Sequence, residues 1–286
     1  MSVKAILDPS RTLHSRREYS VEMRGKLAGV LLSVVQYISD GNLGEVLETR
    51  GFQAKVVNWL AAHSRISFPL RATKLNAFKE WVKGAVDSDV LQASQIESAR
   101  WMDQHVKGAY QLGLARGLKE TIARSVEYKA RWDSGGWEPL GKNYIVGERA
   151  EDLSYLMTAN FDGIKDITTQ MQHKMARQVS EGMAAGLEPE VIISRIGDAI
   201  DVSFLRARLL SMTEMVRAHH IGTYRMYDEL GVATVELMVE TIAQGGACSD
   251  CEAMANNPMS LGEAFDLIPL HPLCKCVIVP FFRRAA

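Results

Sequence analysis

The sequence predicts a mainly α-helical protein that ends in a small module of helix and β-sheet. Apolar residues recur at helical spacing through most of the chain before about residue 233, which is typical of long amphipathic helices. Only after that point does the period change, in two β-rich segments at 234–240 and 277–279. We therefore expect long amphipathic helices followed by a short β-sheet.

The N-terminal half contains four stretches with helical periodicity. The expected helices cover about 15–38, a short segment around Val56 to Leu60, a segment around Phe78 to Val86, and about 94–126, the last as one long or broken helix. The Asp40-Gly41 pair supplies a stop after the first helix, and a loop with Pro69 precedes the third. Several glycines weaken the fourth helix.

The run DSGGWEPLGKNYIVG at 133–147 has glycines, a proline and no helical period, so it is the expected linker. The predicted organisation is an N-terminal helical domain (1–132), the linker loop (133–147) and a C-terminal domain (148–286). In the C-terminal domain, one apolar stripe runs from Leu153 to Val179 and is closed by Gly186 as a C-terminal cap. Pro189 stands where a new helix would start, and a last stripe over about 203–230 is ended by Gly231.

Composition and charge narrow the class of protein. The 286 residues carry a formal net charge of -1 and 47% apolar residues, which gives no global attraction to nucleic acid but enough material for a sizeable core. The longest uncharged apolar run, at 29–39, is shorter than the roughly 20 residues that a bilayer requires. The first residues, MSVKAILDPSRT, lack the features of a secretory signal, so we expect the protein to be made and kept in the cytoplasm.

All four cysteines lie in one short stretch together with a histidine. Cys248 and Cys251 form CSDC, whose two-residue spacing lets a tight turn direct two thiolates at one ion, and PLHPLCKC adds His271, Cys274 and Cys276. In an extended strand the last two cysteines project from the same face, so both could reach one ion. Alternatively, His271 and one of them complete a set of three cysteines and one histidine. The sequence leaves both ligand sets open.

Thiolates with imidazole favour zinc or an iron-sulfur cluster over magnesium or calcium, and we predict zinc. Four protein ligands would make it a closed structural site without an open position for catalysis. The alternative is a group of reduced, partly buried thiols that hold no ion. A zinc nucleobase deaminase is excluded, because its signature needs a Glu two positions after the His, where this chain has Leu273.

Other residues suggest no catalytic site, and we predict that the chain is not an enzyme. Glu214 lies one turn before Arg217 and is expected to form a surface or inter-helix ion pair. Of the adjacent His219 and His220, one is expected to be exposed and one packed. The five tryptophans are expected to be core anchors first and interface residues second; they are Trp59, Trp81, Trp101, Trp132 and Trp137. The chain has neither a phosphate-binding glycine loop nor a Gly-x-Ser-x-Gly elbow.

With these motifs laid out, the chain resembles the minor head (head morphogenesis) proteins of tailed bacteriophages, the family typified by the F protein of phage Mu. The shared C-terminal order is a helix with Thr213-Glu214, then Gly231, a β-segment, CSDC, and HPLCKC followed by VIVP. The N-terminal half is similar in DPSRT at 8–12, FKEW at 78–81 and AYQLGL at 109–114. Departures include Met238 where relatives commonly have Trp, QGGA at 244–247 where they have an Asp, AMANNP after the second Cys, and Lys275 for Arg.

The resemblance implies a virion protein present in few copies inside the capsid at the portal vertex. Such a protein would assist head assembly and influence DNA packaging or ejection, with the phage portal protein as its partner. The major capsid or scaffold protein and packaged double-stranded DNA are further candidate partners, and a membrane is not. The competing hypothesis is a zinc-dependent nucleic-acid-binding module that acts on packaged DNA and uses scattered basic residues such as Arg283-Arg284.

Overall fold

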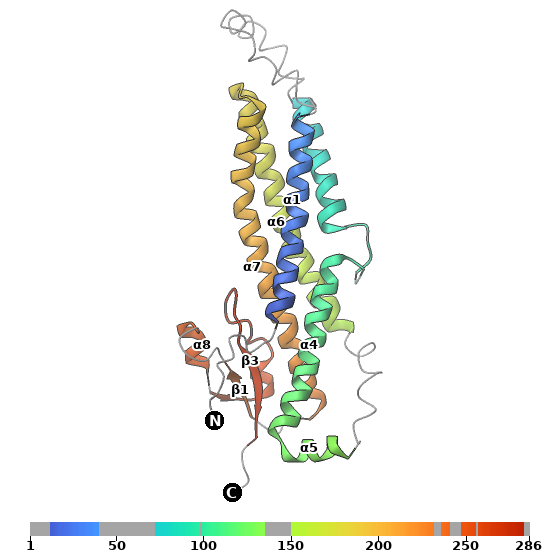
Figure 1. The fold of residues 1–286 in the computed structure, drawn as a ribbon, viewed down its shortest axis with the longest axis vertical. Coiled ribbons are helices and arrows are strands. Elements are labelled where there is room, and N and C mark those ends of the chain that lie inside the picture. The colour runs from blue at the N-terminus through green and yellow to red at the C-terminus, as the bar shows by residue number, and fades with distance from the viewer. Residues whose placement is uncertain are drawn as a thin grey trace, which may run out of the picture. The chain divides into compact units, whose positions relative to one another are not determined.

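The structure, a computed structural model, is described for residues 12–39, 72–97, 99–134, 150–231, 236–240, 247–255 and 257–282 (Figure 1). This part of the chain is mainly helical and carries one small three-stranded sheet near its C-terminal end, as the sequence predicted. The expected helix around Val56 to Leu60 and the loop with Pro69 lie outside the described residues.

The first helices follow the predicted apolar periods. Helix α1 spans Leu13–Ser39 and buries one stripe, which includes Val30 and Val34. A helix over 72–86 buries Phe78 and Val82 and runs directly into a π-helical turn, η2, at Asp87–Leu91. Gln92 then ends the helical run in a left-handed conformation, with φ of 48°.

The fourth expected helix, over about 94–126, is present as α4 at Trp101–Arg124. A further helix, α5 at Val126–Asp133, was not predicted. Between them Ser125 is extended and its side chain accepts a hydrogen bond from the backbone N–H of Tyr128, so it caps α5 in the way that serine commonly caps helices. Helix α4 begins at Trp101 and not near residue 94.

The two longest helices are α6 (Ala150–Ala185) and α7 (Pro189–Glu229). Gly186, with φ of 60°, ends α6 as predicted: its N–H donates to the carbonyl of Met183 and the N–H of Leu187 donates to that of Gly182. The sequence suggested a helix start at Pro189 and a separate stripe from 203, whereas the structure joins them in one helix of 41 residues. Gly231, with φ of 67°, follows its end as expected.

The sheet has the strand order β2-β1-β3, and both pairings are antiparallel. Strands β1 (Glu236–Glu240) and β3 (Val277–Phe281) confirm the two predicted β-segments (Figure 1). In their pairing, Met238 lies opposite Val279. Strand β2 (Pro258–Met259) was not predicted, since two residues are too few to show a period. The short helices α8 (Ser249–Met254) and α9 (Leu261–Ala264) complete the C-terminal module.

The chain divides into two compact units, each of which draws on segments from both sides of the 133–147 run. One unit comprises Met1–Ser20, Ile96–Phe161 and Leu209–Ala286, and the other comprises Val21–Gln95 and Asp162–Arg208. The predicted division into 1–132 and 148–286 stays a prediction, and most of its linker, 135–149, lies outside the described residues.

In the first unit, α4 packs against the C-terminal half of α7 at glycines. A Cβ atom on Gly113 would lie 2.0 Å from the carbonyl oxygen of His219, and one on Gly222 would lie 2.2 Å from that of Tyr110. The hydroxyl of Thr223 donates to the carbonyl of Gly113 across the crossing, at 3.1 Å. The two backbones therefore approach more closely than any residue with a side chain would allow.

In the second unit, the core is formed by the inward stripes of several helices. Its buried residues include Phe78 and Val82 of the 72–86 helix, Met175 of α6 and Ile196 of α7. No described helix is long and apolar enough to cross a membrane.

The glycine crossing gives a test of the packing. Gly113→Ala should lower the free energy of unfolding by about 2–3 kcal/mol, because the methyl group would meet backbone atoms that cannot rotate away. Urea denaturation followed by circular dichroism measures this change. Gly108→Ala is the matched control on the same helix: no described atom lies within 4 Å of its Cβ position, so it should stabilise the chain by about 0.5–1 kcal/mol. Equal effects of the two variants would contradict the close crossing.

Candidate metal centre

The segment from Ala247 to Phe282, which contains all four cysteines and His271, is called the cysteine module here. It packs against the C-terminal half of α7. Three polar side chains of α7, Thr213, His220 and Tyr227, are spaced by seven residues, which is about two helical turns, and so share one face. Each of them bonds to backbone of a different part of the module. Together they attach the module to the helix at three successive levels.

The first of these bonds reaches the HPLCKC box. The backbone N–H of Leu273 donates to the hydroxyl of Thr213 at 3.3 Å. Leu273 has a positive φ of 64°, in the left-handed region. The bond to Thr213 therefore stabilises an unusual backbone conformation within the HPLCKC box.

The other two bonds reach α9 and the sheet. His220 Nε2 lies 2.8 Å from the carbonyl oxygen of Ala264 and 3.0 Å from that of Phe265, so the nitrogen must carry a proton and donate to them. The hydroxyl of Tyr227 donates to the carbonyl of Ile278 in β3, at 3.2 Å.

The thiols themselves belong to the hydrophobic core of the module. Cys251, Cys274 and Cys276 are no more than 3% exposed, and Cys248 is exposed. All four carry free thiols. The core cluster around them includes Val216, Tyr227, Met259, Leu261, Ala264, Ile268 and Ile278.

Cys248, Cys251 and His271 form one group of potential ligands. Cys248 caps the N-terminus of α8 and Cys251 lies in its first turn, so the CSDC turn directs both sulfurs to one side. His271 Nε2 lies 3.1 Å from the sulfur of Cys248 and 3.0 Å from that of Cys251. The other ring nitrogen, Nδ1, is 2.8 Å from the carbonyl oxygen of Pro272 and donates to it, which leaves Nε2 as the metal-binding nitrogen.

A second group joins Cys251 to Cys274 and Cys276. The ligand atoms of each group lie within 4.8 Å of one another. Cys251 belongs to both groups, and all five predicted ligands are therefore brought together where they could hold a metal ion. The choice between a set of four cysteines and a set of three cysteines with His271 stays open.

The thiols influence one another strongly. The thiol of Cys276 donates to the sulfur of Cys274 and lowers the pKa of Cys274 to about 5, while the same bond and burial raise the pKa of Cys276. Burial raises the pKa of Cys251 to about 12. The neighbouring thiols thus stabilise the thiolate form of Cys274 by hydrogen bonding to its sulfur. A bound cation takes the place of the thiol protons, since thiolates and not thiols are the ligands.

The donor set fits a soft, four-coordinate cation. Thiolate sulfurs and one imidazole nitrogen suit zinc, whose structural sites take four such ligands in a tetrahedron. The chain supplies enough donors to fill every position. The bond from His271 to Pro272 and the bond from Leu273 to Thr213 orient the ligand box from outside the ligand shell.

Two other predicted polar residues differ from expectation. His219 and His220 are both buried, each 2% exposed, so the prediction that one of them is exposed was wrong. The reason is that α7 is covered on two sides here, by α4 and by the cysteine module. Burial lowers the pKa of His219 to about 3 and that of His220 to about 4. Both imidazoles are neutral at physiological pH.

The predicted ion pair of Glu214 with Arg217 is present, at 3.2 Å. The pair lies within one helix and does not join two helices. It is half-buried, because Glu214 is only 8% exposed while the side chain of Arg217 is 34% exposed. Burial raises the pKa of Glu214.

The tryptophans follow the prediction in part. Trp101 is 8% exposed and packs edge-on against Tyr19, as a core anchor. Trp81 stacks on Tyr37. Trp132, in contrast, is 46% exposed at the end of α5. Trp59 and Trp137 lie outside the described residues.

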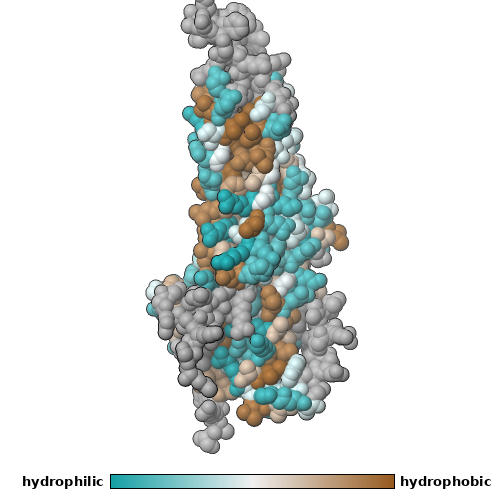
Figure 2. All heavy atoms as spheres, in the orientation of Figure 1, coloured by the Kyte–Doolittle hydropathy of each residue, from teal (hydrophilic) through white to brown (hydrophobic). Residues whose placement is uncertain are grey.

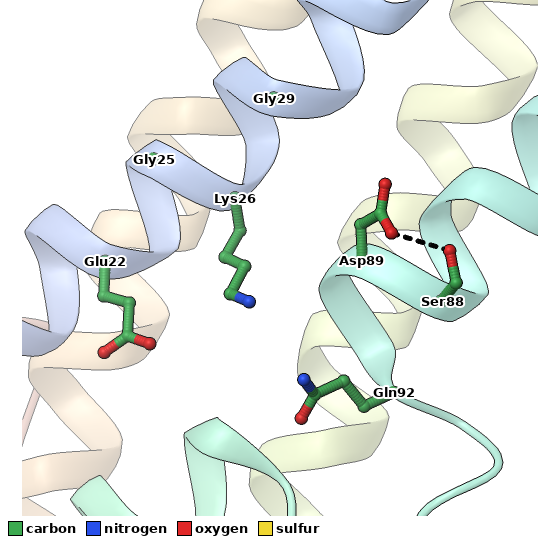
Figure 3. A pocket seen from close by; sticks show the side chains of 7 residues that line it. All are labelled: Glu22, Gly25, Lys26, Gly29, Ser88, Asp89 and Gln92. Atoms are coloured by element: carbon green, nitrogen blue, oxygen red, sulfur yellow. Dashed lines mark hydrogen bonds between the residues drawn. The ribbon is translucent and has the colours of Figure 1, made fainter.

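The second unit contains a separate open groove, between α1 and the segment around η2 (Figure 3). On the α1 side the groove is lined by Gly25 and Gly29, which have no side chains to fill it. The side chains of Lys26 and Gln92 extend into the space. Asp89 accepts a hydrogen bond from the hydroxyl of Ser88 at 2.7 Å. Its mixed charges and wide opening indicate no particular ligand.

Metal content tests the centre directly. Chain purified under reducing conditions should contain about one zinc ion per molecule, and Cys251→Ser should contain almost none, because Cys251 belongs to both ligand groups. Inductively coupled plasma mass spectrometry measures the content. The matched control is Ser249→Ala, in the same turn, which should keep the metal. Full zinc content in Cys251→Ser would contradict the centre.

The same measurement on three further variants identifies the ligand set. Retention of zinc in His271→Gln with loss in Cys274→Ser and in Cys276→Ser indicates the four cysteines. Loss in His271→Gln with retention in one of those two cysteine variants indicates three cysteines and the histidine.

The buried histidine His219 predicts a pH dependence of stability. Its pKa is about 6.5 in the unfolded chain and about 3 when folded, so below pH 6.5 only the unfolded chain takes up the proton. His219 should therefore make the free energy of unfolding fall as pH decreases below 6.5, with a slope that approaches about 1.4 kcal/mol per pH unit near pH 5. In His219→Gln, the free energy of unfolding should depend less steeply on pH, by the same slope. Urea denaturation at a series of pH values measures this difference.

His14→Gln is the control for this comparison, because His14 has a side chain that is 85% exposed. The two variants are compared for the change in slope that each produces. The metal ligands are the same in all three proteins, so acid release of the metal cancels in the difference. An unchanged slope in His219→Gln would contradict a neutral, buried imidazole.

Comparison of the chain with protein-family models, with curated proteins and with solved structures finds no match. The assignment of a function therefore depends on the residues and their geometry, together with the resemblance in motif order described above.

Proposed function

We propose that this chain is a minor head protein of a tailed bacteriophage, which binds inside the capsid at the portal vertex and assists head assembly and DNA packaging or ejection. One observation carries the proposal: the separate parts of the motif that resembles this family are in contact with one another. Thr213 bonds to Leu273 of the HPLCKC box, and Tyr227 of the same helix bonds to the VIVP strand at Ile278.

The role of the metal follows from this arrangement. We propose a structural zinc ion that is held by four of Cys248, Cys251, His271, Cys274 and Cys276. When bound, zinc would link the CSDC turn at the start of α8 to the HPLCKC box, which directly precedes β3. With all four positions taken by protein, the function is one of binding and not of turnover.

The charge of the cysteine module favours a protein partner over DNA. Between Ala247 and Phe282 the chain has four carboxylates, at Asp250, Glu252, Glu263 and Asp266, and only one ammonium group, at Lys275. Sequence-independent binding to DNA requires several lysines or arginines at the phosphates. The competing nucleic-acid-binding hypothesis would depend on Arg283-Arg284, which lie outside the described residues. The portal protein is therefore the partner that we propose first.

The composition of phage heads tests the proposal. In a phage that carries this gene, heads separated from tails and from host protein should contain the chain, at far lower abundance than the major capsid protein. Quantitative mass spectrometry of gradient-purified heads measures both. The chain should also co-purify with the portal protein when the two are expressed together.

The metal variants supply the control. A phage that lacks the gene would be complemented with the wild-type chain, with Cys251→Ser or with Ser249→Ala. Incorporation into heads should fall for Cys251→Ser alone, because this substitution destabilises the cysteine module, through which we propose that the chain binds its protein partner. If heads of normal protein content never contain the chain, it is not a head protein.

A further inference from the structure

An apolar groove of about 460 Å³ lies between α4 and α5 in the first unit. Leu118 and Ile122 of α4 and two alanines form its apolar part, Trp132 of α5 borders it, and Lys119 and Lys129 are its charged residues. It is distinct from the cysteine module. On the face shown in Figure 2, hydrophobic patches likewise interrupt the hydrophilic surface.

Helix α4 is apolar on two opposite sides. One side, with Tyr110, Gly113 and Gly117, is buried against α7. The other side carries Leu112, which is 46% exposed, and the partly buried Leu118 and Ile122. Apolar side chains that gather at a surface groove, with polar residues around them, mark contact sites more often than scattered ones do. The second side therefore has the composition of a contact surface.

Helix α5 is held in place without being part of the core. None of its eight residues, all of which are described, is buried. The hydroxyl of Tyr128 donates to the carbonyl of Leu230 at 2.6 Å, and this bond together with the Ser125 cap fixes the helix. Trp132 is consequently held beside the groove while 46% of it is exposed. Tryptophan is among the residues that most often anchor protein interfaces, and this one is already positioned for contact.

The charges around the groove specify the partner. Both charged lining residues are lysines. Lys129 bonds to Asp133 at 2.7 Å, but this pair is well exposed and such pairs contribute little. Lys119 has no ion-pair partner among the described residues. A partner segment that fills the groove would thus bind more strongly if it carried carboxylates along its edges, near these lysines.

We propose that the α4–α5 groove binds an acidic amphipathic helix of a partner protein, with the apolar face of that helix against Leu118, Ile122 and Trp132 and its carboxylates near Lys119. The apolar side from Leu112 to Ala123 spans about 17 Å at 1.5 Å per residue, enough for three turns of such a helix. A concave site with two lysines suits a helix better than a flat lipid surface. This inference does not depend on the head-protein proposal.

Peptide binding to the full chain tests the groove. The probe is a fluorescently labelled 18-residue amphipathic helix with leucines on one face and glutamates on the other, and binding is measured by fluorescence anisotropy. Binding should occur, should weaken as salt is raised, and should fall by about 30-fold in Trp132→Ala. Lys119→Glu should also weaken it. Lys107→Glu, the same charge change at an exposed site on α4 outside the groove lining, should not.

Further measurements separate the alternatives. A peptide with the same leucines but lysines in place of the glutamates should bind far more weakly, and equal binding overturns the charge argument. Vesicles of phosphatidylglycerol that bind in a Trp132-dependent manner would instead make the groove a membrane site. A dimer of the chain that Ile122→Glu abolishes would make the occupant a second copy. Either of the last two results overturns the proposal, as does unchanged peptide binding in folded Trp132→Ala.

Discussion

The close crossing of α4 and α7 is the constraint on which the first unit depends. At Gly113 and Gly222 the two backbones lie so near that a single methyl group would overlap a carbonyl oxygen. The glycines determine the distance between the two helices. The bond from Thr223 to Gly113 also prevents one helix from sliding along the other. This contact presents one face of α7 to the cysteine module and leaves the opposite side of α4 open. The positions of these glycines therefore determine where both proposed functional surfaces lie, the cysteine module and the α4–α5 groove.

The cysteine module is too small to be stabilised by its sheet alone. Its strands have five, two and five residues, and such a sheet needs a helix or a covalent or metal link to be stable. The structure supplies the helix through Thr213, His220 and Tyr227, and the donor cluster offers the metal link. Three of the candidate ligands are buried thiols of the hydrophobic core, so removal of the proposed metal would affect packing and geometry together.

The two surfaces differ in charge and hence in the partners that suit them. The cysteine module is acidic apart from Lys275, whereas the charged residues that line the α4–α5 groove are Lys119 and Lys129. On α7, His219 and His220 are buried and neutral, and Glu214 is paired with Arg217. The structural role within a larger assembly that we propose agrees with this chemistry.

The sequence by itself determined the features that depend on neighbours within a few residues. Helical periods predicted most of the described helices, glycines at 186 and 231 predicted helix ends, and the types and spacing of the cysteines and His271 identified the ligand cluster. The tertiary structure decided what depends on coverage by distant segments. The burial of both His219 and His220, the exposure of Trp132 and the role of Gly113 could not be predicted, because helical spacing shows which residues share a face but not which faces are covered. The partner of Gly113, Thr223, is 110 residues away, and only the folded chain brings the two together.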